Sequence, residues 1–389
     1  MRVKPRVLMV TGAYYPELSG GGLQARALVR ALRDEADFRV LTTSTDASLP
    51  RYADEDGVPI RRIYVDTGRR VSRLHASTAL VSAFLDAAPH VDIVNLHGFS
   101  RKATPLVALS RLLRKKFALT LQTGVHDEPP AARALGTRAF WAYTHADLYF
   151  SVSPGLSQAY VNAGLDRGRL RQVCNAVDVD RFRPASPAEK RALRVKLGLP
   201  DVPLVLFVGF FSRDKRPDLL YRAWSRSASA SASALVFVGA TEKANLEVDP
   251  EVAGGIRAAV AASGTADRVV FAGVTREVDD YVRAADVFVL PSIREGLSIS
   301  LLEAMSTALP VVATRITGST DALIVPDTSG LLVEPDDVEG FARAIDALLT
   351  DGDTARRLGA AARQTILDRY SIQRTAAAWL AGYRELASA

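Results

Sequence analysis

The chain has 389 residues, of which 48% are hydrophobic and 24% are charged, a composition typical of a globular protein with about two domains. The single cysteine, Cys174, excludes an intramolecular disulfide, and no cluster of cysteine and histidine has the spacing of a zinc site. The formal net charge of +6 at pH 7 suits an anionic partner, whereas an aromatic content of 7% argues against a nucleic-acid groove. We therefore expect a protein of the reducing cytoplasm that binds neither a metal nor nucleic acid.

Short β-branched runs alternate with segments of helical periodicity over nearly the whole length. This alternation is typical of parallel sheets built from βαβ units, so the sequence predicts the α/β fold class. The expected strands cover residues 7–10, 38–41, 92–96, 117–121, 148–152, 204–208, 234–238, 269–271, 287–290 and 311–313.

The order of strand, glycine-containing loop and helix occurs twice, first from residue 6 and again from residue 203. Between the two lies the stretch 180–187, whose proline and charge content predicts a linker. The last stretch, 372–386, has Trp379, Leu380 and Tyr383 at helical spacing, as in a helix that packs on a domain surface or spans both domains. We predict two Rossmann-like domains, residues 1–183 joined by the helix 372–389, and residues 184–371.

No apolar run approaches the roughly 20 residues that cross a bilayer, so we expect at most peripheral membrane contact. The short run 7–10 leads directly into a glycine-rich loop and predicts a first strand, not a secretion signal. One basic run fits contact with an anionic inner membrane face, although a solvated helix end explains it slightly better. Its residues are Arg111, Arg114, Lys115 and Lys116, interleaved with Leu112, Leu113 and Phe117.

The clearest chemical signal is the segment 291–305, PSIREGLSISLLEAM, which directly follows an apolar strand. Gly296 frees a turn, and the backbone N–H groups near Ser298 and Ile299 would form a helix N-terminus able to bind phosphate. Glu295 falls in the turn and Glu303 about two helical turns later. Two carboxylates flanking such a helix start could hold hydroxyl groups on either side of a diphosphate. Spacing alone supports equally well a structural interpretation, in which Glu295 complements the helix dipole and Glu303 is an exposed helix glutamate.

This segment resembles the E-x7-E motif of retaining glycosyltransferases of family 4, and residues 310–313 and Gly318 continue the resemblance. Four more segments resemble that family in the same order along the chain: 15–24 its first glycine loop, 175–182 its NGVD segment, 208–215 its donor-phosphate loop and 330–336 its GLLV-P-x-D turn. The resemblance implies the GT-B fold, with two Rossmann-like domains facing across a cleft and a C-terminal helix crossing back to the first.

The same resemblance implies transfer of a hexosyl-type sugar from a nucleoside-diphosphate sugar to a hydroxyl of a glycan or lipid-linked acceptor. It implies retention of configuration, without cofactor, metal or protein nucleophile, in the assembly of cell-surface polysaccharide or glycolipid. An epimerase or phosphorylase of the same fold and a non-catalytic nucleotide-sugar-binding protein stay open as alternatives. A dinucleotide-dependent oxidoreductase does not fit, because the spacing G-x-G-x-x-G is absent from residues 12–22. Asp178 and Asp180 could suggest a metal site, but they fall inside the NGVD-like segment, where a structural role fits better.

The family's residue roles carry over to matching positions. Glu295 would hold the donor sugar near the reacting carbon, and Glu303 would bind the ribose. Lys215 would contact the diphosphate, together with backbone N–H groups of the first glycine loop, although an exposed charge and a tight turn are the structural alternatives. The predicted donor-binding set is Gly21, Gly22, Gly209, Arg213, Lys215, Gly296, Leu297, Ser298, Ile299 and Glu303.

The chain departs from the family at two positions. Phe210 follows Gly209 where the family has an arginine, and Arg213 is the nearest candidate to replace its charge. Gln122 stands where the family has an active-site histidine, so the identity of that catalytic group is open.

The predicted catalytic set is Glu295, Gln122 and His126, which follows Gln122 by four residues. Gln122 would donate to the sugar, and His126 would reach the acceptor hydroxyl. His97 follows an expected strand and is a candidate on the acceptor side. A lone histidine is more often structural, but titration near neutral pH would make both testable. The donor base is expected to contact backbone near residues 239 and 273.

Overall fold

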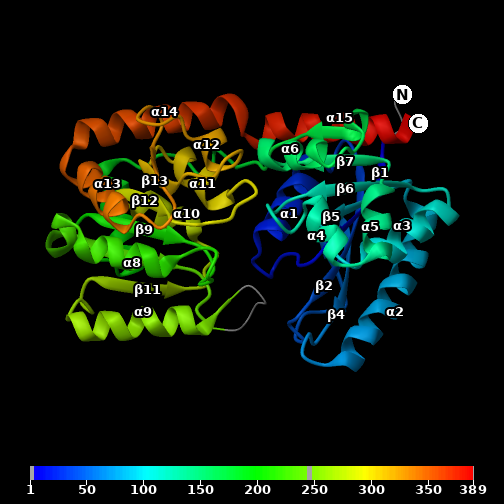
Figure 1. Ribbon diagram of the computed structural model, residues 1–389, viewed down its shortest axis with the longest axis horizontal. Helices are drawn as coiled ribbons and strands as arrows, with labels where there is room; N and C mark the ends of the chain where they lie inside the picture. The colour runs from blue at the N-terminus through cyan, green and yellow to red at the C-terminus, as the bar shows by residue number, and fades with distance from the viewer. Residues whose placement is uncertain (1–3, 243–247, 389) are drawn as a thin grey trace. The chain divides into compact units, whose positions relative to one another are not determined.

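The computed structural model describes residues 4–242 and 248–388 (Figure 1). It divides into two compact units, Met1–Ala176 with Ile372–Ala389, and Val177–Ser371. Residues 177–183, which we predicted in the first domain, belong to the second unit. Val177 donates its N–H to the Tyr370 carbonyl at 3.0 Å, and the Phe182 carbonyl accepts a hydrogen bond from the Ser306 hydroxyl at 2.6 Å. The chain therefore enters the second unit before the predicted linker, because these two hydrogen bonds hold residues 177–182 on that unit.

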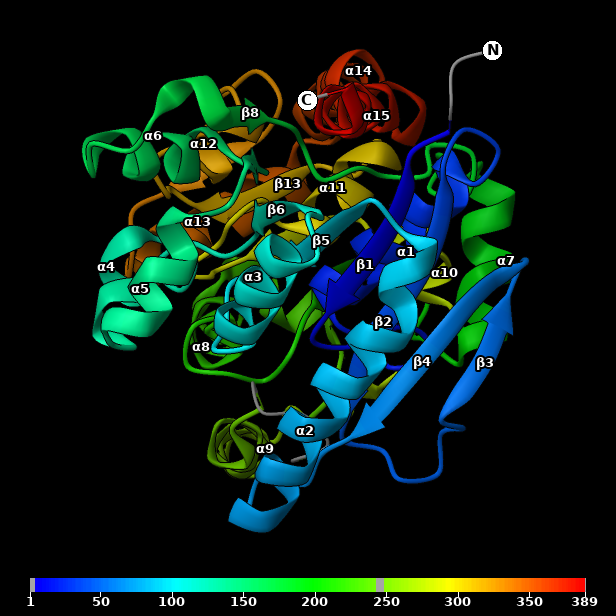
Figure 2. The same ribbon diagram turned by 90° about the vertical axis from the view of Figure 1, so that its right-hand side faces the viewer.

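The first unit contains an eight-stranded sheet in the order β3-β4-β2-β1-β5-β6-β7-β8, parallel except for the β3–β4 pair. Figure 2 shows α2 crossing in front of β2 and β4. The strands are β1 (Arg6–Thr11), β2 (Asp37–Ser44), β3 (Tyr52–Glu55), β4 (Val58–Tyr64), β5 (Ile93–His97), β6 (Lys116–Leu121), β7 (Leu148–Ser151) and β8 (Leu170–Gln172). The helices are α1 (Gly20–Leu32), α2 (Arg70–Ala87), α3 (Ala103–Leu112), α4 (Pro129–Ala134), α5 (Thr137–Thr144), α6 (Pro154–Asn162) and α15 (Ile372–Ser388), with short 3₁₀ turns at Ala88–His90 and Arg167–Arg169.

The second unit contains a six-stranded parallel sheet in the order β11-β10-β9-β12-β13-β14. Its strands are β9 (Leu204–Val208), β10 (Ala234–Val238), β11 (Val269–Gly273), β12 (Val287–Leu290), β13 (Val311–Thr314) and β14 (Leu331–Val333). Its helices are α7 (Pro187–Leu197), α8 (Pro217–Arg226), α9 (Pro250–Ser263), α10 (Val278–Ala284), α11 (Ile299–Ser306), α12 (Thr320–Leu323), α13 (Val338–Thr350) and α14 (Gly352–Arg369), with a 3₁₀ turn at Ala228–Ala232.

All ten expected strands are present, which confirms the α/β class. Strands buried on both faces give continuous apolar runs, and these runs are what the sequence displays. The four missed strands are β3, β4, β8 and β14. The β3–β4 hairpin turns at Asp56 and Gly57, both at positive φ, and an Asp-Gly pair is a recognised hairpin signal that we did not use.

The basic run at 111–116 does not form one continuous apolar and basic face. Phe117 lies inside β6 and is buried, whereas Leu112 at the end of α3 is 76% exposed. Phe117 therefore cannot insert into a membrane, and only the leucines remain for such contact. No helix in the described part of the chain is long and apolar enough to span a bilayer.

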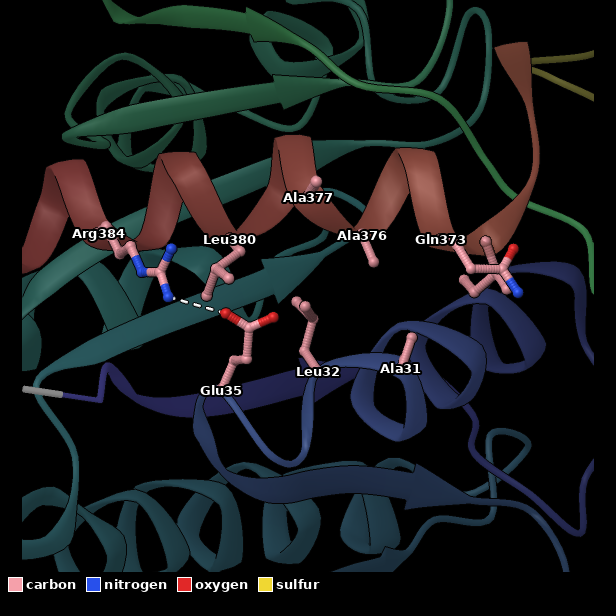
Figure 3. A pocket seen from close by; sticks show the side chains of 9 residues that line it. Ala31, Leu32, Glu35, Gln373, Ala376, Ala377, Leu380 and Arg384 are labelled. Atoms are coloured by element: carbon pink, nitrogen blue, oxygen red, sulfur yellow. Dashed lines mark hydrogen bonds and ion pairs between the residues drawn. The ribbon is translucent and has the colours of Figure 1, made fainter. Parts of the chain in front are cut away.

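The C-terminal helix α15 packs on the first unit, where its aromatic side chains are buried. Trp379 and Tyr383 lie against Phe150 of β7, with ring centroids 4.5 and 5.5 Å away, and Tyr383 accepts a hydrogen bond from Asn95 Nδ2 at 2.7 Å. On another face α15 lies along α1. Figure 3 shows the groove between these two helices, bridged by an ion pair between Arg384 and Glu35 at 2.8 Å. The helix that the sequence predicts over 372–386 is thus part of the first unit's core.

This close packing yields a stability prediction at Gly382. A Cβ added there would lie 2.4 Å from Phe150 Cε1, whereas a Cβ at Gly255 in α9 would meet nothing within 4 Å. We expect Gly382→Ala to destabilise α15 by about 1–3 kcal/mol through overpacking. Gly255→Ala, the matched control, should stabilise α9 by about 0.5–1 kcal/mol through helix propensity. Native-state hydrogen exchange of each helix measures both, and unchanged protection of α15 in Gly382→Ala would contradict the packing.

Candidate active site

The segment 291–305 begins as a turn after β12 and continues into α11. The Ser298 hydroxyl accepts the N–H of Leu301 at 3.4 Å, so Ser298 caps the helix that starts at Ile299. Gly296 and Leu297 lie in the buried turn before this cap. The helix start that the sequence predicts is therefore present, and its first N–H groups provide the partial positive charge that suits an anion.

Glu295 forms a nearly buried ion pair with Lys215, from the loop between β9 and α8. Both carboxylate oxygens of Glu295 accept hydrogen bonds from Lys215 Nζ, at 2.7 and 2.9 Å. The carboxylate side chain is 6% exposed and that of the lysine 25%. A carboxylate this far from water needs a compensating cation, so each side chain fixes the other. The sequence motifs pointed to both residues but not to their pairing.

Asp214 ties the same two loops together through different atoms. Its carbonyl accepts the N–H of Ile293 at 2.8 Å, and its carboxylate forms an ion pair with Arg294. Neither Asp214 nor Arg294 was singled out from the sequence, because an acid and a base in two separate loops carry no spacing signal. Together with the Lys215–Glu295 pair, they hold the donor-phosphate loop against the turn that precedes α11.

Arg213 lies on the surface of the second unit. Its side chain is 75% exposed and pairs with Asp249 at 2.8 Å and Glu251 at 3.1 Å, both at the start of α9. These carboxylates compete with any diphosphate for the guanidinium. The role of Arg213 as a replacement for the family's arginine stays a prediction, and it requires these pairs to open.

Glu303 lies in α11 with its carboxyl group in a different environment from that of Glu295. Among the described residues, no lysine, arginine or histidine nitrogen lies within 4.0 Å of it, and the nearby Arg181 pairs with Asp279 instead. Burial raises the pKa of Glu303 to about 8, with a smaller raising effect from Asp279 and an opposing one from Arg181. At neutral pH without ligand the group is therefore largely protonated, which the sequence did not predict.

The strand ends of the second unit approach each other backbone to backbone. Gly239 donates its N–H to the Gly273 carbonyl at 2.8 Å, and Gly209 donates its N–H to the Val238 carbonyl at 2.9 Å. A Cβ at Gly239 would lie 1.9 Å from the Gly209 carbonyl oxygen, and its φ of +145° also favours glycine. These glycines shape the edge where the donor base is expected.

In the first unit, His97 and Gln122 lie side by side at the ends of β5 and β6. Gln122 Nε2 is 2.7 Å from His97 Nε2, so the imidazole accepts there and carries its proton on Nδ1. That Nδ1 is buried and has no hydrogen-bond partner in the described chain. Burial lowers the pKa of His97 to about 3, so this histidine stays neutral and does not titrate near pH 7, contrary to our expectation.

The other residues predicted in the first unit are Gly21, Gly22 and His126. A Cβ at Gly21 would lie 4.0 Å from His97 Cδ2, which places the glycine loop beside the His97–Gln122 pair. Gly22 donates its N–H to the Ser19 hydroxyl at 3.1 Å, and a Cβ there would lie 2.5 Å from the Ala13 carbonyl oxygen. Close packing against Ala13 therefore explains the glycine at position 22 without any ligand. His126 is exposed in the turn after Gln122.

Asp127 holds the loops of this cluster in place. Its buried carboxylate accepts three backbone N–H groups, from Phe99 at 2.7 Å, Gln122 at 2.6 Å and Thr123 at 2.9 Å. Burial raises the pKa of Asp127, and the three bonds oppose that shift. The loops after β5 and β6 therefore share one anchor. No sequence signal distinguished Asp127 from an ordinary turn aspartate.

Asp178 and Asp180, considered as metal ligands, form part of a turn. Asp178 Oδ1 accepts the backbone N–H groups of Asp180 at 3.1 Å and Arg181 at 3.0 Å. Within residues 4–242 and 248–388, no three His, Cys, Asp or Glu side chains gather as metal ligands. The structural role that we favoured for this segment agrees with these bonds.

Comparison with known proteins identifies relatives over nearly the whole chain. Residues 189–365 match the family described as glycosyl transferases group 1, and residues 19–176 match the glycosyl transferase 4-like domain. The D-inositol 3-phosphate glycosyltransferase of Xylanimonas cellulosilytica is 28% identical, covering 98% of this chain and 97% of the relative. The α-maltose-1-phosphate synthase of Mycolicibacterium smegmatis is also 28% identical, covering 98% and 100%.

Solved structures share the fold. Sucrose-phosphate synthase from Thermosynechococcus elongatus superposes with a TM-score of 0.84 at 22% identity, covering 99% of this chain and 100% of that one. Anabaena HepE in complex with UDP-glucose gives 0.79 at 17% identity, covering 99% and 100%. Both sheets, the E-x7-E segment at the start of α11 and these matches agree, so the chain belongs to the family-4 glycosyltransferases of the GT-B fold.

Proposed function

We propose that this glycosyltransferase moves a hexosyl-type sugar from a nucleoside-diphosphate sugar to a hydroxyl acceptor with retention of configuration. The observation that carries the proposal is the Lys215–Glu295 pair beside the N-terminus of α11. This pair holds a cation and a carboxylate together on the second unit, directly before the first turn of α11. The named ligand of Anabaena HepE, UDP-glucose, is of the same chemical class.

In this proposal the second unit binds the donor. Lys215 and the N-terminus of α11 stabilise the negative charge that develops on the departing diphosphate, without a metal ion. Glu295 orients the sugar hydroxyls, and Glu303 accepts hydrogen bonds from the ribose. The departing phosphate itself takes the acceptor's proton, so no protein nucleophile is needed.

The first unit contributes the acceptor side. Gln122 replaces the family's histidine as a hydrogen-bonding group, and its amide nitrogen is already engaged by His97. Its Oε1 is therefore left to accept a hydrogen bond from the acceptor, while the buried His97 holds the amide in place. Because His97 stays neutral, this pair orients hydroxyl groups and transfers no proton.

Mutating Glu295 tests the proposal. Glu295→Gln should depress turnover strongly and leave affinity for the free nucleoside diphosphate nearly intact, because that ligand has no sugar to hold and the glutamine oxygen can still accept a hydrogen bond from Lys215. Release of nucleoside diphosphate from UDP-, GDP- and ADP-sugars measures turnover, calorimetry measures affinity, and NMR coupling constants of the product report its anomeric configuration. Normal turnover of Glu295→Gln, or an inverted product, would refute the proposal.

Glu303 should impose a pH dependence on nucleotide binding. Its carboxyl group is largely protonated at pH 7 and must ionise to accept two ribose hydroxyls. Glu303→Gln should therefore weaken nucleoside diphosphate binding by about 1.5–3 kcal/mol near pH 9, and by less near pH 7. Calorimetry at several pH values checks this, with Glu334→Gln, an exposed glutamate of the same unit, as control. A loss that is equal at every pH would contradict the assignment.

The two donor-loop cations give a third test. If Arg213 replaces the missing arginine, Arg213→Ala and Lys215→Ala should each weaken nucleoside diphosphate binding by about 1.5–3 kcal/mol and leave nucleoside binding little changed. Arg222→Ala, which removes an exposed charge from α8, is the control. If only Lys215→Ala weakens nucleoside diphosphate binding, Arg213 is a surface residue that pairs with the start of α9 and does not contact the diphosphate.

A further inference from the structure

Lys102 occupies an unusual position in the first unit. It lies in the loop after β5, directly before α3, and its Nζ donates to the Thr43 hydroxyl of β2 at 2.8 Å. Thr43 in turn donates to the Gly12 carbonyl at 2.7 Å, immediately after β1. Since β1 lies between β2 and β5, the lysine side chain passes over the carboxyl end of β1.

This ammonium group is not compensated by the protein. Within the described residues, no carboxylate oxygen lies within 4.0 Å of Lys102 Nζ, whereas Arg26 and Arg61 of the same unit pair with Glu55 and Asp86. An ammonium has three N–H donors, and the one hydrogen bond found uses a single donor. Burial lowers the pKa of Lys102 to about 8, so it is still mostly charged at neutral pH. A desolvated cation normally has an anionic partner.

The place of this cation is where ligands bind in α/β sheets. The strand order reverses at β1, with β2 on one side and β5 on the other, and ligands bind outside the carboxyl ends of strands at such a point. His97 is the last residue of β5 and is in register with Thr11 at the end of β1. Lys102 and the His97–Gln122 pair therefore share one edge of the sheet.

We propose that Lys102, oriented by Thr43, binds an anionic group of the acceptor, either a phosphoryl or a carboxylate group. The acceptor assignment rests on the proposed function, but the anion site itself belongs to the first unit alone. In this arrangement Gln122, held by His97, orients the acceptor's hydroxyls, while Lys102 fixes its charged end across β1. The donor's diphosphate has its own cation, Lys215, in the second unit.

Residue-resolved protection tests the anion site without requiring donor or turnover. The wild-type chain is treated with acetic anhydride in sulfate or in chloride of equal ionic strength, and mass spectrometry of peptides gives the acetylation rate of each lysine. We expect sulfate to slow acetylation of Lys102 and to leave Lys115 and Lys116 unchanged. Equal rates for Lys102 in both salts would overturn the proposal. Because the readout is local, sulfate bound near Lys215 does not interfere.

Two probes then distinguish the sources of the charge. If methyl phosphate protects Lys102 from acetylation at a lower concentration than propionate does, the acceptor is phosphorylated. The reverse order indicates an acceptor sugar with a carboxylate group. Thr43→Val should raise the half-protecting concentration, because the ammonium loses its orienting partner. Protection unchanged in Thr43→Val would remove Thr43 from the site.

Turnover connects this site to the acceptor. Lys102→Met should raise the KM for an anionic acceptor at least about tenfold, the size of a charge-assisted hydrogen bond, and leave the KM for the donor unchanged. Arg101→Met, which removes the neighbouring exposed charge, is the matched control. An unchanged acceptor KM despite sulfate protection would overturn the acceptor role. Absence of nucleotide binding would overturn only the proposed function, since the protection assay needs no nucleotide.

Discussion

The carboxylate of Glu295 is almost wholly removed from water, and the rest of the second unit's site depends on the cation that makes this possible. Lys215 donates to both of its oxygens, so two loops eighty residues apart in sequence close on each other. Desolvation of either charge alone would cost more than the fold recovers. The Asp214 contacts to Ile293 and Arg294 then fix the same loops through backbone and side chain. These contacts fix the turn before α11 and therefore also fix the position of the helix start at Ile299.

The first unit also relies on a buried carboxylate at a sheet edge, but there backbone N–H groups and not a lysine compensate it. Asp127 gathers three backbone N–H groups from the loops after β5 and β6, so one buried carboxylate sets both His97 and Gln122. The departure from the family at position 122 is then less disruptive than the sequence suggested. Gln122 has no titrating ring and its neighbour His97 stays neutral, so in the proposed function this edge orients the acceptor and transfers no proton.

The features that depend on local chemistry could be predicted from the sequence. Buried parallel strands give apolar runs, and the helix start after Glu295 gives a turn and a cap, so both were predicted. The β3–β4 hairpin was missed because β3 is short and polar and β4 mixes apolar residues with arginines, although Asp56-Gly57 marked the turn. The unit boundary was misplaced because the bonds of Val177 and Phe182 reach residues more than 100 positions away. The Lys215–Glu295 pairing and the uncompensated charge of Lys102 arise only when distant strands align.

Charge compensation distinguishes two kinds of buried residue in these sites. Glu295 and Asp127 are satisfied by the protein and hold loops in place. Glu303 and Lys102 are partly buried with no opposite charge within 4.0 Å in the described part of the chain, and burial shifts the pKa of each toward the neutral form. Such groups do not stabilise the fold, because burying a charge without a partner costs free energy relative to leaving it in water. In the functions proposed above, a ligand supplies the missing partner and offsets this cost, with ribose hydroxyls for the carboxylate and an anion for the ammonium.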